Sequence, residues 1–231
     1  MNRFALIILL TLLPASLLLA QTIPAEAFKA KLDATSNAQI LDVRTPGEFA
    51  NGHLPNAQNL NVQDTDFDAG AAKFDKTKPV FVYCLSGGRS KTAGAKLRDM
   101  GYTNVYELQG GYLKWTTKML PVSGVQRNTT VTWTSARLNS LIQAQPLVLV
   151  DVYAAWCGPC QKMKPTIEKL TQEFAGKATV VNVNADADKE IMKQYSVDEI
   201  PVILLFRNGK LVSREIGYQE ESRLRTLLTG N

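Results

Sequence analysis

Short runs of β-branched and aromatic residues alternate with helical patterns along most of this 231-residue chain. The runs that predict strands are residues 39–43, 80–83, 105–108, 147–153, 179–183 and 202–206. Strands that alternate with helices pair into a central sheet whose faces the helices cover. The sequence therefore predicts α/β architecture. The length allows two domains, since a domain commonly holds about 100–200 residues.

The alternation stops once, at a polar segment that runs from Pro121 to Thr130. This segment has no sustained period, and a proline and a glycine lie in its first half. Such a composition is typical of a linker. We therefore expect a linker at residues 120–130, between a first domain at residues 24–119 and a second domain at residues 131–231.

Residues 1–20 have the pattern of a secretory signal peptide, in which Arg3 precedes an apolar run that ends in a proline and small residues. We expect cleavage after Ala20 and export of the remaining chain, most simply to the periplasm. The alternative is an uncleaved N-terminal anchor that faces the periplasm, because residues 4–20 form a 17-residue apolar stretch at the short end for a membrane span. No other stretch of the sequence is long and apolar enough to cross a membrane.

The basic residues are spread evenly, although the net charge is +5. Residues 26–118 hold 12 basic against 10 acidic side chains, and residues 121–231 hold 13 against 11. Proteins that bind nucleic acid concentrate positive charge in runs or on one face, so this class of partner is excluded. The three cysteines are too few for a disulfide-built scaffold, which leaves chemical reactivity as their expected role.

Cys84 lies between a predicted strand and a predicted helix, in a loop that can bind an anion. Gly87 and Gly88 allow the backbone to fold into a cradle with its N–H groups pointing inward. The helix dipole and Arg89 add positive potential, and Ser90 is expected to be the N-cap of the helix. A cysteine in such a cradle is stabilised as a nucleophilic thiolate.

Three separated motifs in this half of the chain resemble the rhodanese (sulfurtransferase) domain. They are LDVRTPGEFANGHLPNA at residues 41–57, CLSGGRS at residues 84–90 and LQGGYLKW at residues 108–115. The resemblance implies a central, mainly parallel sheet, and a Cys84 that accepts a sulfane sulfur and becomes a persulfide. The residues that would bind the transferred sulfur or its anionic donor are Leu85, Ser86, Gly87, Gly88 and Arg89. Leu85 stands where many members have a basic residue, so the rim of the loop is less positive.

Other interpretations of this half have less support. Cysteine phosphatases share the strand–loop–helix arrangement but need Cys-x5-Arg, whereas only four residues separate Cys84 from Arg89. The loop is therefore too short to enclose a phosphate and suits a single sulfur atom. His53 is the only histidine, and we interpret it as a local hydrogen-bonding group, not as a base for Cys84. Asp42 and Arg44 are expected to pair within the fold, and the chain offers no zinc ligand set.

Cys157 and Cys160 belong to the sequence WCGPC at a predicted strand-to-helix turn. Their spacing allows a short disulfide, and the helix dipole favours a thiolate on Cys157. Zinc would need two further ligands nearby, and the sequence supplies none. Asp151 interrupts the preceding apolar strand, where a carboxylate is costly unless it has a role. We expect Cys157 to lie at the exposed end of the helix with Cys160 one turn inside, so that Cys157 is alkylated first.

This second half resembles thioredoxin through WCGPC, through EIPVILLFRNG at residues 199–209 and through the Ile-Gly pair at residues 216–217. The resemblance implies a central mixed sheet and a redox-active Cys157–Cys160 disulfide. It further implies that Pro201 is a cis-proline opposite the dithiol and that Ile200 offers backbone hydrogen bonds to a bound substrate strand. Asp151 matches the buried acid that handles a proton for the resolving cysteine, and Trp156 supports the dithiol. Asn182 stands where the family often has a lysine.

The two resemblances imply an exported sulfurtransferase joined to a thiol–disulfide oxidoreductase that needs no cofactor and no metal. In the first hypothesis, the dithiol reduces a persulfide on Cys84 or protein disulfides. In the second, the protein is a general periplasmic disulfide reductase whose first domain only binds partners or carries sulfur. In the third, the protein is a non-enzymatic sulfur carrier. The implied partners are a sulfane-sulfur donor, a thiol acceptor, protein disulfides or persulfides, and a membrane thiol-electron transporter.

Overall fold

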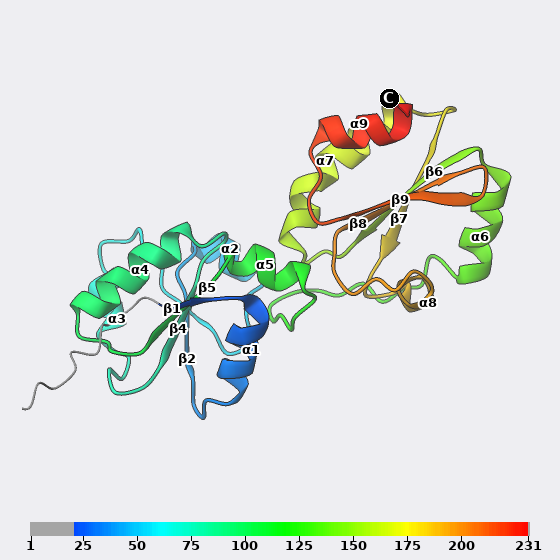
Figure 1. The fold of residues 1–231 in the computed structure, drawn as a ribbon. Coiled ribbons are helices and arrows are strands. Elements are labelled where there is room, and N and C mark those ends of the chain that lie inside the picture. Colours follow the sequence, from blue (N-terminus) through cyan, green and yellow to red (C-terminus); the bar gives the residue numbers. More distant parts are fainter. Residues whose placement is uncertain (1–20, 231) are drawn as a thin grey trace, which may run out of the picture.

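The structure is a computed structural model that describes residues 21–230, so the expected signal peptide at residues 1–20 lies outside the described residues. It contains two sheets, one in each half of the chain, and each sheet has helices on both faces. The two halves form separate lobes with one short helix between them (Figure 1). Within residues 21–230, no helix has the length and apolar composition that a membrane span requires.

The N-terminal domain is built on a five-stranded sheet in the order β1-β5-β4-β2-β3, in which every pairing is parallel. Its strands are β1 (Gln21–Ile23), β2 (Gln39–Asp42), β3 (Gln58–Asn59), β4 (Val80–Tyr83) and β5 (Val105–Leu108). Its helices are α1 (Ala25–Asp33), α2 (Pro46–Ala50), α3 (Phe67–Ala71), α4 (Gly88–Asp99) and α5 (Gly111–Thr117). The expected parallel sheet is confirmed.

Side chains alternate across the central strands of this sheet and create two apolar layers. Val80 and Val82 of β4 pack with α3 and α4 on one face, whereas Phe81 and Tyr83 pack with α1 and α5 on the other. All four residues of β4 are buried, as expected for a central strand of a parallel sheet. Trp115 of α5 is fully buried in the second layer, so α5 is anchored in the N-terminal domain.

The C-terminal domain is built on a four-stranded mixed sheet in the order β7-β6-β8-β9, with β6 parallel to β7 and the other pairings antiparallel. Its strands are β6 (Leu147–Tyr153), β7 (Thr179–Asn184), β8 (Val202–Arg207) and β9 (Lys210–Ile216). Its helices are α6 (Ser135–Ala144), α7 (Gly158–Glu173), α8 (Lys189–Gln194) and α9 (Glu221–Thr229). Helices α6 and α8 cover one face of the sheet, and α7 and α9 cover the other. The expected mixed sheet is confirmed.

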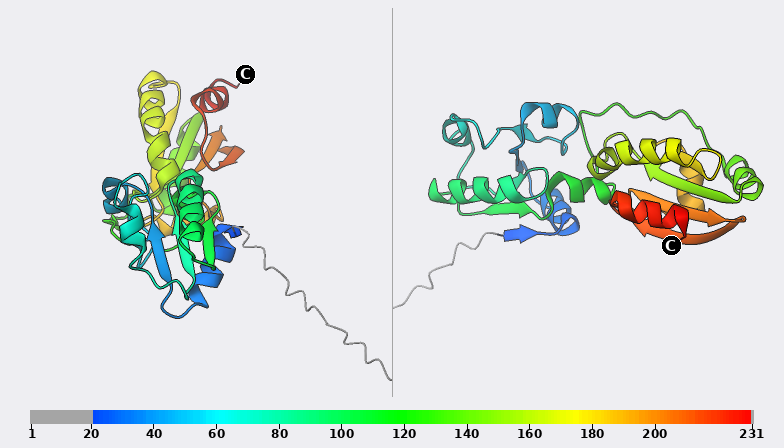
Figure 2. Two further views of the ribbon diagram at one scale, coloured as in Figure 1. Left: turned by 90° about the vertical axis from the view of Figure 1, so that its left-hand side faces the viewer. Right: turned by 90° about the horizontal axis from the view of Figure 1, so that it is seen from above.

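The segment between α5 and α6 is held by both domains. The backbones of Ser123 and His53 form an isolated antiparallel bridge, which fixes the segment to the N-terminal domain. Arg127 then pairs with Asp186 at 2.6 Å, and the Asn184 amide donates to the carbonyl of Asn128 at 3.0 Å. Figure 2 shows the same two lobes from two further sides, with this segment running from one to the other. The segment is therefore a bound connection in this structure.

Candidate active site

Cys84 follows β4 directly and lies under the first turn of α4. Its side chain is 1% exposed, its thiol donates to Oγ of Ser90 at 3.5 Å, and the N–H of Gly87 donates to its Sγ at 3.1 Å. Gly87 has a φ of 106°, a left-handed conformation that glycine adopts without a side-chain clash. This turn points a backbone N–H at the sulfur, so the loop can stabilise negative charge on it.

Helix α4 begins at Gly88, with Gly87 as its N-cap, so the expectation that Ser90 is the N-cap is wrong. The left-handed Gly87 turns the chain into the helix three residues earlier. Ser90 consequently lies in the first helical turn, where its hydroxyl donates to the carbonyl of Gly87 at 3.0 Å and accepts from the Cys84 thiol. In that position Ser90 supports the sulfur directly.

Arg89 faces a carboxylate that the sequence analysis did not single out. Its guanidinium donates two hydrogen bonds to Glu48 of α2, at 2.7 and 2.6 Å. The hydrogen bonds from Arg89 lower the pKa of Glu48 to about 2, so the pair stays ionised at neutral pH. An anion that binds Arg89 must therefore compete with Glu48. Of the other loop residues, Ser86 and Gly88 are exposed, and Leu85 is half-buried.

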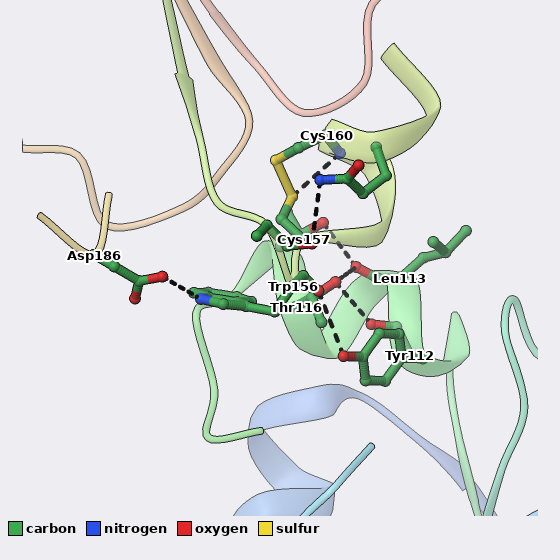
Figure 3. Close-up of a disulfide and its surroundings, with 10 residues drawn as sticks. Tyr112, Leu113, Thr116, Trp156, Cys157, Cys160 and Asp186 are labelled. Atoms are coloured by element: carbon green, nitrogen blue, oxygen red, sulfur yellow. Dashed lines mark hydrogen bonds between the residues drawn. A yellow bond between two sulfur atoms is a disulfide. The ribbon is translucent and has the colours of Figure 1, made fainter. Parts of the chain in front are cut away.

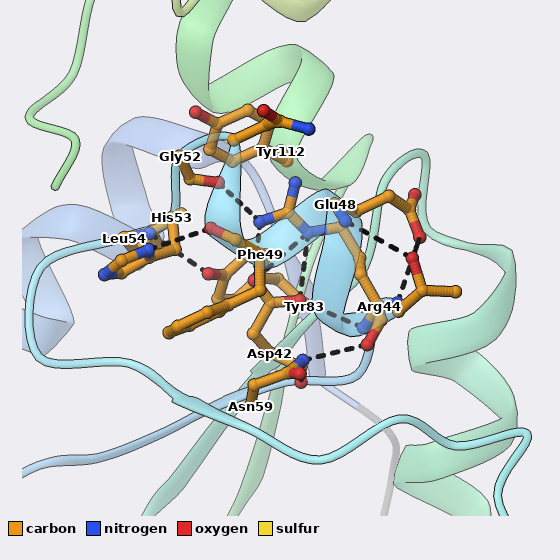
Figure 4. Close-up of polar contacts among 12 residues, drawn as sticks. Asp42, Arg44, Glu48, Phe49, Gly52, His53, Leu54, Asn59, Tyr83 and Tyr112 are labelled. Carbon is orange, nitrogen blue, oxygen red and sulfur yellow. Dashed lines mark hydrogen bonds and ion pairs between the residues drawn. The ribbon is translucent and has the colours of Figure 1, made fainter. Parts of the chain in front are cut away.

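A buried ion pair fixes the chain behind the Cys84 loop. Arg44 donates from Nε and Nη2 to the Asp42 carboxylate, at 2.9 and 2.6 Å, and from Nη2 to the carbonyl of Gly52 at 2.7 Å (Figure 4). His53 stacks on Phe49, and its Nδ1 lies 3.0 Å from that residue's carbonyl oxygen. The expected Asp42–Arg44 pairing is present, and these contacts of His53 are local and structural.

The second pair of cysteines forms a disulfide at the start of α7. Cys157 is the N-cap of this helix, the two Cα atoms are 5.2 Å apart, and Sγ of Cys157 accepts a hydrogen bond from the N–H of Cys160 at 3.2 Å. A sulfur at a helix N-terminus is stabilised as a thiolate. The expected exposure of Cys157 is wrong, because Cys157 is 0% exposed and Cys160 is 4% exposed.

Helix α5 of the N-terminal domain covers this disulfide. Figure 3 shows Tyr112, Leu113 and Thr116 beside Cys157 and Trp156. The end of a Leu113 side-chain branch lies 2.6 Å from where a Cβ on Gly158 would be, so the two helices touch at the dithiol. The Tyr112 hydroxyl donates to the carbonyl of Trp156 at 3.4 Å. The two halves therefore meet at their cysteine-bearing ends.

The loop before β8 completes the covered surface. The Ile200–Pro201 peptide bond is cis, both residues are buried, and the N–H of Ile200 donates to the carbonyl of Thr117 at the end of α5, at 2.9 Å. Trp156 is held from the other side by a hydrogen bond from its Nε1 to Asp186, at 2.8 Å. Ile200 thus makes a backbone hydrogen bond next to the dithiol, and its acceptor belongs to the same chain.

Asp151 lies on β6 beneath the dithiol. Burial raises the pKa of its carboxyl group to about 7, and its Oδ1 has no hydrogen-bond partner among residues 21–230. Asp151, Cys160 and Asn182 line the same cavity of about 430 Å³, and Asn182 of β7 is the register partner of Asp151. A carboxyl group that titrates near neutral pH and shares a cavity with the second thiol can accept a proton from it.

The contribution of α5 was missed by the sequence analysis. Its motif, at residues 108–115, was assigned to the first domain, and a motif does not show what packs against its outer face. One signal was the Gly110–Gly111 pair, since the carbonyl oxygens of Cys84 and Leu85 lie 2.4 and 2.6 Å from where a Cβ on Gly111 would be. That close approach places the start of α5 against the Cys84 loop. Glu48 was also missed, because it looks like an ordinary capping residue in sequence.

Comparisons with known proteins match each half to one family. Residues 24–118 match the family model of the rhodanese-like domain, and residues 129–230 match that of thioredoxin. A thioredoxin of Alicyclobacillus acidocaldarius is 40% identical over 99 residues, which are 43% of this chain and 94% of that protein. Thioredoxin C-2 of Corynebacterium nephridii is 33% identical over 91 residues, which are 39% of this chain and 84% of that protein. A solved mutant thioredoxin of Halobacterium salinarum is 30% identical, with a TM-score of 0.41 over 44% of this chain and 88% of its own.

Proposed function

Because this chain belongs to the thioredoxin family and carries a rhodanese-like domain ahead of its thioredoxin domain, we propose that it reduces sulfane sulfur with its own dithiol. The two families support thiol–disulfide oxidoreductase and sulfurtransferase-like roles. In the proposed cycle, Cys84 accepts a sulfane sulfur and the Cys157–Cys160 dithiol removes it as hydrosulfide. The observation that carries the proposal is the meeting of the two cysteine-bearing ends at α5.

The first step is the loading of Cys84. Its thiolate attacks the sulfane sulfur of a donor, a new sulfur–sulfur bond forms, and the donor leaves with the electron pair of the broken bond, as sulfite from thiosulfate or as a thiolate from a persulfide. The Gly87 N–H, which lies 3.1 Å from Sγ, supports negative charge in the cradle. Before Cys84 loses its proton, its thiol donates to Oγ of Ser90 at 3.5 Å, which orients the sulfur.

The second step is reductive. The Cys157 thiolate attacks the outer sulfur of the Cys84 persulfide. The outer sulfur moves to Cys157, which becomes a persulfide, and Cys84 is released as a thiolate. The Cys160 thiolate then attacks Sγ of Cys157, displaces hydrosulfide and closes the disulfide. The dithiol loses two electrons, and the sulfane sulfur gains them. Attack by Cys157 on the inner sulfur instead displaces hydrosulfide and gives a mixed Cys84–Cys157 disulfide, which Cys160 resolves with release of the Cys84 thiolate. Asp151, with its pKa near 7, takes the proton of the Cys160 thiol.

The cycle needs electrons, because each turnover leaves the Cys157–Cys160 disulfide. If the chain is exported by residues 1–20, these electrons come from outside its compartment. From the signal-peptide pattern of residues 1–20, we propose that the protein works in the periplasm. A membrane thiol-electron transporter would then re-reduce its disulfide. A substrate thiol or persulfide and protein disulfides are the other partners in this scheme.

Mass spectrometry of the loaded protein tests the first step. After incubation with thiosulfate or a small persulfide, the peptide that contains Cys84 should gain about 32 Da, the mass of one sulfur atom on a nucleophilic thiolate. Cys84→Ser is the matched control and should gain nothing. If no donor adds mass to Cys84 in the folded chain, the sulfurtransferase part of the proposal is wrong. The general disulfide reductase would then be the better description.

A further inference from the structure

We propose that the dithiol face of the thioredoxin domain has the chain's own rhodanese-like domain as its resident partner, and that α5 excludes bulky thiols and disulfides from Cys157 until the two domains separate. The inference rests on the proposed redox function of the dithiol and names the partner that this face selects. Attack on a disulfide requires access to the sulfur that is attacked. In this structure Cys157 is 0% exposed, so the rate of exchange at its sulfur is controlled by access to it.

The contact has the features of a specific interface. A backbone hydrogen bond joins the N–H of Ile200 to the carbonyl of Thr117 at 2.9 Å, and Leu113 packs on Gly158 at the start of α7. Thr116 and Thr117 are both buried, and Ile200 is fully buried. Burial of apolar and hydrogen-bonded groups in one contact stabilises it without leaving unpaired polar atoms. The last carbonyls of a helix need donor partners, and the N–H of Ile200 supplies one of them.

Charged groups add a second set of contacts at the C-terminal end of α5. Lys118 is half-buried and donates to Glu199, which directly precedes Ile200. The same ammonium group lies 3.0 Å from Glu26 of α1. One lysine thus joins a carboxylate of each domain. Because these groups are partly exposed to water, salt weakens their attraction.

The connecting segment also favours the closed arrangement. Met119, Val122 and Val125 pack against the apolar core of the thioredoxin domain, while Ser123 is bridged to His53 of the other domain. Arg127 lies over the ring of Trp156, with its guanidinium carbon 5.1 Å from the ring centre. A segment that is ordered on both surfaces loses less entropy on closure than a free tether would.

The same contacts show where the domains would separate. Helix α5 is bound to the Cys84 loop, since the N–H groups of Tyr112 and Leu113 donate to the carbonyls of Cys84 and Leu85 at 2.8 and 3.0 Å. Its Trp115 is buried in the N-terminal core. Opening therefore occurs between α5 and α7, and α5 stays with the rhodanese-like domain. The resulting gap exposes Cys157 without disrupting either core.

The test compares two reductants of the oxidised full chain, dithiothreitol and a reduced thioredoxin as the bulky thiol. Lys118→Glu places a third acidic side chain beside Glu26 and Glu199, which opens the interface. It should speed reduction by the bulky thiol about fivefold, the upper range for a partly exposed ion pair, with a smaller gain for dithiothreitol. Lys114→Glu is the matched control, because Lys114 is an exposed lysine of the same helix. It should leave both rates unchanged.

Equal rates with the bulky thiol for the unmodified chain, Lys118→Glu and Lys114→Glu would overturn the inference. If Lys118→Glu does not fold, the unmodified chain is measured at two salt concentrations. Raising the salt from about 0.01 M to about 1 M screens the same ion pairs, so it should speed reduction of the disulfide by the bulky thiol more than reduction by dithiothreitol. If salt did not speed reduction by the bulky thiol selectively, the inference would be overturned. Failure of the proposed redox function looks different, since neither reductant would then reduce the disulfide in any variant.

Discussion

The Cys84 loop and the Cys157–Cys160 turn are built in the same way but differ in the groups beside the sulfur. Each follows a buried strand, each places a cysteine sulfur next to a backbone N–H at a helix start, and each cysteine is almost fully buried. Cys84 has a glycine cradle and a neighbouring serine. Cys157 has a second cysteine one turn away and a buried acid beneath it. The helix start stabilises negative charge near both sulfurs, and in the proposed cycle the neighbouring groups decide whether a sulfur stores an atom or transfers electrons.

The largest expected effect separates the two cysteines. Cys157→Ser should lower disulfide reduction by at least about a thousandfold, because the attacking sulfur is gone, while it leaves sulfur loading of Cys84 intact. Cys84→Ser should have the opposite pattern. The measurement pairs insulin reduction in dithiothreitol with the mass of the Cys84 peptide. If either variant lost both activities while remaining folded, the division of labour would be contradicted.

Asp151 should make the stability of the oxidised form depend on pH. The pKa of this carboxyl group is 3.8 in its ordinary state and about 7 in the fold, so the folded chain holds a proton that the unfolded chain releases between these values. Stability therefore falls as pH rises from about 4 to about 7, because charging the buried group is unfavourable. Asp151→Asn cannot ionise, and this loss should be absent.

Denaturant unfolding of the oxidised protein measures the effect. The stabilisation of Asp151→Asn relative to the unmodified chain should be about 2–3 kcal/mol greater at pH 8 than at pH 5. Asp198→Asn changes an exposed aspartate of the same domain and should show no such difference. If the stability difference between Asp151→Asn and the unmodified chain did not depend on pH, Asp151 would already be ionised in the fold at pH 5.

Substitution of Gly87 tests whether the left-handed turn of the Cys84 loop positions the sulfur for loading. An alanine there must adopt a φ of 106°, which costs about 1–3 kcal/mol, although the nearest atom to its Cβ would be 3.6 Å away. Gly87→Ala should therefore slow sulfur loading about tenfold and leave the dithiol unaffected. Gly88→Ala is the control, since a Cβ on Gly88 meets no atom within 4 Å and its φ needs no glycine. Equal loading of both variants would show that the Gly87 turn does not position the sulfur.

The smallest expected effect concerns Glu48. Glu48→Gln removes the charge that neutralises Arg89 and keeps the shape of the side chain. Loading from an anionic donor such as thiosulfate should rise about two- to fivefold, in line with the strength of a partly exposed ion pair. Loading from a sulfane-sulfur donor without negative charge should not change. Slower loading from thiosulfate would instead indicate that Glu48 is needed to hold Arg89 in place.

The sequence predicted the parts of this molecule that depend on local patterns. Residues 80–83, 105–108 and 147–153 form strands with the predicted limits, because short runs rich in β-branched and aromatic residues between turn residues are distinctive. The edge strand β9 was not predicted, since its exposed residues lack an apolar face. Cys157 was expected to be exposed because it lies at the start of a helix. The cover comes from Leu113 and Thr116 of the other half, and such a contact between domains leaves no period or motif in the sequence.

In the proposed cycle, the dithiol of a chain reduces the persulfide on Cys84 of the same chain. The direct measurement is hydrosulfide release after Cys84 has been loaded and the dithiol reduced, followed at several protein concentrations. For the unmodified chain, we expect first-order release with a rate constant that does not depend on protein concentration. A mixture of Cys84→Ser and Cys157→Ser chains should release hydrosulfide only in a slower, concentration-dependent reaction. If the mixture released hydrosulfide as fast as the unmodified chain at micromolar concentration, transfer within one chain would be contradicted.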